Sequence, residues 1–220
     1  MARPPRYALI PTTGRPCLKD CIDAIQDQVD KIFLVQGGPQ TKPLVWDDYP
    51  IITEPELNIS KWWNLGLTVI ESRLWDLHHR AMPWDVAILN DDAIVPRGWM
   101  DAVCAAMRET GSAAGCSGGT SIPYRVIHHE PGPVGLMTRM KGFAFVLAGE
   151  KGVRANETLR WYFSDDHVDW LSRQLGGMVM VPGFPVEHLY PNGQVTPEMH
   201  QIIAEDAQAF TAYWGGMRPW

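Results

Sequence analysis

The chain of 220 residues lacks most features of secreted, metal-scaffold and membrane proteins. It has four cysteines, and none of them shows the paired CxxC spacing of a zinc site: Cys17, Cys21, Cys104 and Cys116. Four cysteines in a chain of this size do not indicate a secreted disulfide scaffold, so we expect reduced, mostly buried thiols. The short apolar stretch at the N-terminus is too brief for a signal peptide or a membrane span. We therefore expect a cytosolic protein without a membrane span.

Positive charge is also scarce. The 19 basic residues are outnumbered by 25 acidic ones, and no sustained basic stripe follows the chain, so nucleic acid is not an expected partner. No GxGxxG follows the first apolar run, which excludes a Rossmann dehydrogenase. The hydrophobic content of 45% is typical of a folded protein, and the length suits one well-buried domain covering residues 1–220.

Apolar runs alternate with helical periodicity along the chain, which predicts an α/β fold. Expected strands cover residues 7–11, 32–35, 50–53, 86–89, 143–148 and 178–181. Expected helices begin near residue 16 and cover 63–77, 99–108, 165–175 and 196–213, and Asn58 or Ser60 could cap the second of these. The segment 111–135 is rich in Gly, Ser and Pro, so we expect a mobile connection over a functional site there.

The run of apolar residues 86–89 stops at Asn90, Asp91 and Asp92. Carboxylates clustered at a strand end repel one another unless a cation or a donor-rich ligand compensates them. A divalent ion that bridges a diphosphate would do both, although a polar turn or helix cap is the alternative interpretation. Because ligand sites of open α/β sheets lie at strand ends, we expect these residues and Gly14 and Arg15 to surround one cleft.

Over nearly all of its length the chain resembles the inverting GT-A glycosyltransferases of family two. YALIPTTGRPCLKDCIDAI resembles the opening strand, loop and helix of that family, NISKWWNLGL its segment ending in Asn-x-Gly, and ILNDDAIVPRGWMDAV its DxD strand. KGFAFVLAGE resembles the acceptor-side strand and WYFSDDHVDWLSRQLG the acidic start of the helix that supplies the base. The resemblance implies one GT-A domain with a mostly parallel central sheet flanked by helices. Residues 1–98 would bind the nucleotide sugar and residues 99–220 the acceptor.

The resemblance also implies roles for single residues. Asp92 matches the ligand of the metal and diphosphate, and His188 matches a histidine that completes the shell of a Mn²⁺ or Mg²⁺ ion. Asp165 and Asp166 match the acidic pair that provides the catalytic base, and we favour Asp166. On the residues alone, a double-Asp N-cap explains this pair equally well.

Residues that would bind the nucleotide sugar on the same comparison are Pro11, Thr12, Arg15, Gln36, Lys61, Asn64, Asn90 and Asp91. Two departures from the family pattern stand out. The aspartate that reads the base after the second strand is replaced by Gln36 and Gly37, which leaves UDP, GDP and dTDP open. The arginine ahead of Asn-x-Gly is replaced by Trp63, which removes a charge expected near the pyrophosphate.

The expected activity is therefore transfer of a sugar from a nucleotide sugar to a hydroxyl of a glycan, lipid-linked or protein acceptor. A nucleotidyltransferase of similar fold is a second hypothesis, although PTTGRP is poor in the glycine that a triphosphate loop needs. A catalytically silent, carbohydrate-binding GT-A protein is the third. The sequence leaves the oligomeric state open.

Overall fold

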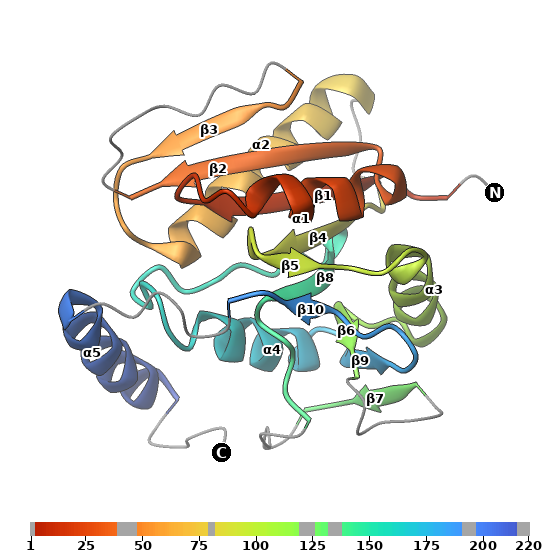
Figure 1. The fold of residues 1–220 in the computed structure, drawn as a ribbon. Helices are drawn as coiled ribbons and strands as arrows, with labels where there is room; N and C mark the ends of the chain where they lie inside the picture. Colours follow the sequence, from red (N-terminus) through yellow and green to blue (C-terminus); the bar gives the residue numbers. More distant parts are fainter. Residues whose placement is uncertain are drawn as a thin grey trace.

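The computed structural model describes residues 3–38, 48–78, 82–118, 126–131, 138–190 and 197–214. These residues form three layers, in which an eight-stranded sheet lies between helices (Figure 1). The strand order is β3-β2-β1-β4-β8-β6-β9-β7, and a separate pair of short strands, β10 and β5, lies over the middle of the sheet (Figure 1). The predicted α/β class is thus confirmed.

The first half of the sheet is parallel. Its strands are β1 (Arg6–Thr12), β2 (Lys31–Gly37), β3 (Ile51–Glu54) and β4 (Asp85–Leu89). The elements that accompany them are α1 (Leu18–Ile25), the 3-10 turn η1 (Gln26–Gln28), α2 (Ile59–His78), β5 (Ala93–Ile94) and α3 (Trp99–Thr110). The Asn58 side chain accepts a hydrogen bond from the Lys61 amide at 3.0 Å, so Asn58 caps α2.

The second half of the sheet is mixed, so the expected mostly parallel sheet is confirmed, although it is not strictly parallel. It contains β6 (Ala114–Ser117), β7 (Ile127–His129), β8 (Ala144–Ala148) and β9 (Met178–Val181). The remaining elements are η2 (Gly149–Lys151), α4 (Ser164–Gln174), β10 (Glu187–His188) and α5 (Pro197–Tyr213). After α3 the chain forms β6 two positions away from β4 in the sheet. β8 later occupies the position between them and runs antiparallel to both β4 and β6.

The expectation of a mobile connection over residues 111–135 is wrong for the part that the structure describes. β6 is a buried strand between β8 and β9. Its small residues reflect close packing, because a Cβ at Gly115 would lie 2.7 Å from Val103 Cγ1 of α3. Residues 119–125 and 132–137 lie outside the described residues.

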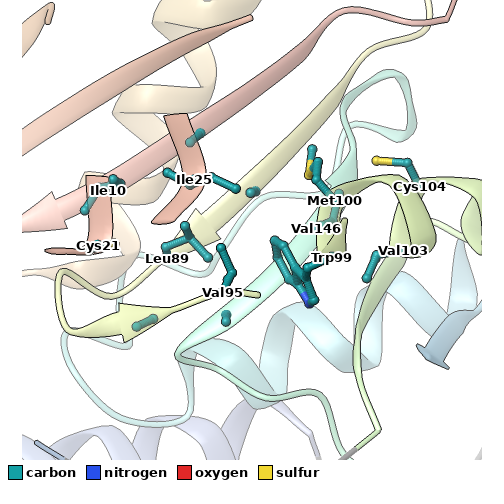
Figure 2. Packing of buried hydrophobic residues seen from close by; sticks show 14 of the residues in the cluster. Ile10, Cys21, Ile25, Leu89, Val95, Trp99, Met100, Val103, Cys104 and Val146 are labelled. Atoms are coloured by element: carbon teal, nitrogen blue, oxygen red, sulfur yellow. The ribbon is translucent and has the colours of Figure 1, made fainter. Parts of the chain in front are cut away.

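Two apolar layers cover the faces of the sheet because successive strand residues point to opposite sides. Ile10 and Leu89 pack with Ile25 of α1 and Trp99 of α3 (Figure 2). The other face packs against α2 and α4 through the following buried residues: Leu9, Phe33, Trp63, Leu67, Ile88 and Val168. Leu77, the last residue of the helix expected at 63–77, is 73% exposed near the end of α2.

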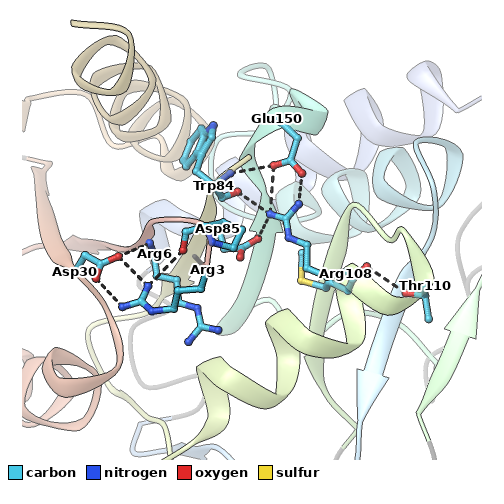
Figure 3. A network of polar contacts seen from close by, with 10 residues as sticks. Arg3, Arg6, Asp30, Trp84, Asp85, Arg108, Thr110 and Glu150 are labelled. Carbon is cyan, nitrogen blue, oxygen red and sulfur yellow. Dashed lines mark hydrogen bonds and ion pairs between the residues drawn. The ribbon is translucent and has the colours of Figure 1, made fainter. Parts of the chain in front are cut away.

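Ion pairs hold the end of the sheet at which β1 and β4 begin. Asp85 is buried at the start of β4 and pairs with Arg108 of α3, which also pairs with Glu150 (Figure 3). Arg3 pairs with Asp30 at 2.6 Å before β1 begins. This network leaves the opposite end of the same strands, where β1 and β4 finish, free to carry a site.

Candidate active site

The ends of β1 and β4 bring two polar segments into contact. Thr12 Oγ1 donates a hydrogen bond to Asp91 Oδ2 at 2.6 Å, and Arg15 donates to Asp92 Oδ2 at 2.9 Å. Arg15 also pairs with Asp91. The parallel pairing of β1 and β4 produces this arrangement because both strands finish at the same edge. The expectation that Asn90 to Asp92 and the loop after β1 surround one cleft is confirmed.

His188 reaches this cluster through the short antiparallel pair of β10 and β5. His188 lies opposite Ala93 in the register, and the Leu189 amide donates to the Asp92 carbonyl at 3.0 Å. The imidazole Nε2 lies 3.2 Å from Asp92 Oδ1, and the ring stacks on Phe143 with centroids 4.4 Å apart. The position of the imidazole is therefore fixed by backbone pairing on one side and by an aromatic ring on the other.

The pKa values of the two aspartates of this cluster are shifted in opposite directions. Burial pushes the pKa of both carboxyls upward. At Asp91 the contacts of Arg15 and Thr12 offset burial only in part, and the pKa is raised. At Asp92 the contacts of His188 and Arg15 outweigh burial, and the pKa is lowered. Asp92 thus loses its proton at lower pH than Asp91.

The residues around Asp92 fit a divalent cation. Asp92 Oδ1 is buried, and no described residue donates a hydrogen bond to it, although it lies 3.2 Å from His188 Nε2. Neighbouring ligands of one ion with bonds of about 2.1 Å lie about 3 Å apart in an octahedral shell. Among the described residues no group of three or more His, Cys, Asp or Glu side chains could hold a metal. The chain would therefore supply two ligands, and the diphosphate and water would supply the others.

Two further carboxyls face the same cavity from α4. Asp166 is 4% exposed, and burial, followed by the charge of Asp165, raises its pKa to about 8 although Arg139 Nη1 lies 3.4 Å away. Burial also raises the pKa of Asp165. Gly142 makes room for this side chain, because a Cβ there would lie 2.1 Å from Asp165 Oδ2. The N-cap of α4 is Phe163, with φ 63°, so neither aspartate is the cap.

Both carboxyl clusters line one cavity of about 780 Å³, within the range of about 300–1,000 Å³ usual for ligand sites. Most of the candidate residues line it: Pro11, Thr12, Arg15, Asn90, Asp91, Asp92, Asp165, Asp166 and His188. Aromatic side chains form much of the remaining wall: Trp62, Trp63, Phe143, Trp161, Tyr162, Phe163 and Tyr190. Trp63 packs edge-on against Phe145, with centroids 5.4 Å apart.

Three candidate donor-binding residues are not among the described residues that line the cavity. Lys61 Nζ lies 3.0 Å from Glu56 Oε2 and 3.2 Å from Glu54 Oε1. Asn64 holds the backbone of Ala155 through two hydrogen bonds of 2.9 Å. Gln36 is buried in β2 opposite Thr12 of β1. Lys61 and Asn64, which lie on α2, thus have structural partners outside that helix, and Gln36 lies within the sheet.

The sequence interpretation missed several residues of the cavity. Arg139 and Lys141 come from the segment before β8, where isolated basic residues carry no local signal. Trp161, Tyr162 and Phe163 come directly before α4. A run of three aromatic residues ahead of an acidic pair is unusual, so it was the one signal that could have identified this part of the wall.

No protein-family model matches the sequence, and no curated protein matches it. Solved structures do match. S. aureus TarS 1-349 superposes with a TM-score of 0.55 at 11% identity, over 95% of this chain and 72% of that chain. GalNAc-T7, crystallised with UDP, GalNAc and Mn²⁺, superposes with a TM-score of 0.58 at 11% identity, over 91% of this chain. The chain has a GT-A-like glycosyltransferase fold.

The GT-A fold confirms the architecture that the sequence resemblance implied. The chain spans 47% of the length of the GalNAc-T7 chain. Its parallel strands carry Thr12, Arg15 and Asp92 at one end of the sheet, and α4 carries Asp165 and Asp166 across the cavity. Over the residues that are described, no helix has the length and apolar character needed to cross a membrane.

Proposed function

We propose that this protein is a metal-dependent glycosyltransferase that moves a sugar from a nucleotide sugar to an acceptor hydroxyl with inversion. One observation carries the proposal. Within a GT-A-like fold, the cluster of Asp92 and His188 and the pair of Asp165 and Asp166 face the same cavity. GalNAc-T7, a structural neighbour, binds UDP, GalNAc and Mn²⁺, which supports a nucleotide sugar and a divalent ion here.

On the donor side, the chain's own groups are suited to a diphosphate. Arg15 offers a guanidinium that already bridges Asp91 and Asp92. Asp92 and His188 would hold a Mn²⁺ or Mg²⁺ ion, which when bound offsets the negative charge that a departing nucleoside diphosphate gains. Imidazole suits Mn²⁺ better than Mg²⁺, so we expect a preference for Mn²⁺.

On the acceptor side, Asp166 is suited to act as general base. It would take the proton of the acceptor hydroxyl while the hydroxyl oxygen bonds to the anomeric carbon and the bond from that carbon to the diphosphate oxygen breaks. A base works best when its pKa lies near the operating pH, and the pKa of Asp166 is raised to about 8. Arg139, 3.4 Å away, orients the carboxylate.

A catalytically silent, sugar-binding protein of the same fold is the second candidate. The observation that favours it is the double ion pair of Arg15 with Asp91 and Asp92, which compensates these carboxylates without a metal. The buried Asp166 argues for catalysis instead, because burying a carboxyl beside another carboxyl is costly and gives no benefit to a simple binding site.

A ligand panel tests the proposal. UDP, GDP and dTDP are each added with Mn²⁺ or Mg²⁺, and thermal stability is recorded, because a specific ligand stabilises the folded state by mass action. The matching nucleotide sugars are then assayed for transfer to a set of glycans, lipid-linked sugars and peptides. Asp166→Asn should keep the stabilisation and lose transfer. If no nucleoside diphosphate stabilises the protein, glycosyl transfer is refuted, and stabilisation without transfer would favour the silent binder.

A further inference from the structure

Helix α5 carries a fully buried carboxylate that bonds to a different part of the chain. Asp206 is 0% exposed. Its Oδ1 accepts the Arg160 amide at 2.9 Å, and its Oδ2 accepts the amides of Trp161 and Tyr162 at 2.7 and 2.8 Å. A buried charge is tolerated only where hydrogen bonds compensate it, and here three consecutive backbone N–H groups do so.

The segment that Asp206 holds is the aromatic part of the cavity wall. Trp161, Tyr162 and Phe163 all line the cavity, and Ser164 then begins α4. Phe163 is the one non-glycine residue with positive φ among the described residues, at 63°. Such a backbone persists only where its surroundings enforce it.

Helix α5 supplies those surroundings through one face. Ile203, Asp206 and Phe210 are spaced by three and four residues, which places them on the same side of a helix. Ile203 lines the cavity, and the Phe210 ring lies 5.3 Å from that of Phe163 at an interplanar angle of 30°. Figure 1 shows α5 at the edge of the molecule, outside the central sheet. The contact of α5 with residues 160–163 is therefore local to this part of the cavity wall, and we call it the clamp.

We propose that Asp206 is a positioning residue, which holds the Arg160–Phe163 segment as the acceptor-side wall next to Asp165 and Asp166. This inference rests on the proposed glycosyl transfer. The clamp lies on the α4 side of the cavity, whereas Arg15, Asp92 and His188 come from β1, β4 and β10. Loss of the clamp should therefore weaken acceptor binding and leave the nucleotide site intact.

Two variants and one control test the clamp. Asp206→Ala removes the carboxylate that accepts all three amide hydrogen bonds. Asp206→Asn keeps one carbonyl oxygen, which can still accept hydrogen bonds from two of the amides. Glu205→Gln is the control, because Glu205 is the neighbouring, exposed residue of α5, and its carboxylate contacts the side chains of Arg160 and Gln201. The three amides bond to Asp206 instead. Amide hydrogen exchange is measured at residues 160–162, together with the affinity for UDP and Mn²⁺ by calorimetry.

We expect exchange at the three amides to rise at least about tenfold in Asp206→Ala, less in Asp206→Asn, and not at all in Glu205→Gln. Affinity for UDP with Mn²⁺ should stay within about twofold. With a donor and acceptor that the wild-type protein turns over, the acceptor KM should rise at least about fivefold while the donor KM stays within about twofold.

Retained protection of the three amides, or an equal loss of nucleotide affinity, would overturn the inference. If Asp206→Ala does not fold, the smaller rise in amide exchange expected for Asp206→Asn tests the inference instead. Exchange needs no ligand, so it separates this inference from the proposed function. A wild-type protein that binds no nucleoside diphosphate refutes glycosyl transfer, and protection that persists in the Asp206 variants refutes the clamp.

Discussion

The substitution Asp165→Asn tests the electrostatic coupling of the two aspartates at the start of α4. The pKa of Asp166 is raised to about 8 by burial and, after burial, by the charge of Asp165. With a pKa of 8, only about a tenth of the molecules carry an ionised Asp166 at pH 7, and about a hundredth at pH 6. If Asp166 is the base, kcat/KM should rise about tenfold per pH unit up to pH 8 and then level off.

Asparagine at position 165 keeps the size of the side chain and removes its charge. The pKa of Asp166 should then fall, because the largest of the charges that raise it is gone. The rising limb of the pH profile should move to lower pH, so activity at pH 6 should increase relative to activity at pH 8. The measurement is kcat/KM between pH 5 and 9 with the nucleotide sugar and acceptor found in the panel.

Asp166→Asn is the matched control. It should lose about 10²- to 10⁴-fold in kcat at pH 8 and above, where the wild-type base is ionised, since general base catalysis contributes about that factor. A profile of Asp165→Asn that coincides with the wild-type profile would contradict the coupling. Loss of all activity in Asp165→Asn, with activity retained in Asp166→Asn, would exchange the two roles.

Three further predictions follow from the same structure. The raised pKa of Asp166 destabilises the fold progressively as pH rises from about 3.8 to about 8, so Asp166→Asn should raise Tm relative to wild type, and by more at pH 9 than at pH 6. Gly142→Ala would place a Cβ 2.1 Å from Asp165 Oδ2 and displace that carboxyl, so the rate of sugar transfer should fall at least about tenfold. The affinity for the nucleotide, measured by calorimetry, should stay unchanged. Gly66→Ala would place a Cβ 2.2 Å from Leu9 Cδ1, so the free energy of unfolding measured in urea should fall by about 1–3 kcal/mol, although alanine favours a helix more than glycine does. An increase in the free energy of unfolding would contradict the close packing of α2 on β1.

Much of the first half of the fold could be predicted from local sequence. Apolar runs bounded by turn residues predict β1, β2 and β4, because parallel strands buried on both faces are continuously apolar. The shorter run at residues 50–53 also predicts β3, although β3 is a partly exposed strand at the edge of the sheet. The second half could be predicted less well. β6 was missed because its sequence, AGCS, has the composition of a loop, and only the close approach of α3 explains its small side chains.

The candidate site could likewise be predicted only in part from the sequence. Asp92 and Arg15 follow directly from strand ends, so their proximity could be predicted from parallel pairing. Lys61 and Asn64 were assigned to the nucleotide by resemblance, but their contacts with Glu56 and Ala155 depend on tertiary structure. Asp206 could not be predicted, because one aspartate within an amphipathic helix carries no local sign of the distant amides that it binds.

Calorimetric titration of the best-stabilising nucleoside diphosphate, with Mn²⁺ and with excess chelator, tests whether Asp92 and His188 form a metal-dependent donor site. We expect saturable binding in Mn²⁺ that is lost in chelator. It also predicts binding about 10- to 100-fold weaker in Asp92→Ala, since contacts to a charged group contribute about 1.5–3 kcal/mol, and unchanged binding in Asp166→Asn. Equal affinity in Mn²⁺ and in chelator, or full affinity in Asp92→Ala, would contradict a metal-dependent donor site at Asp92 and His188.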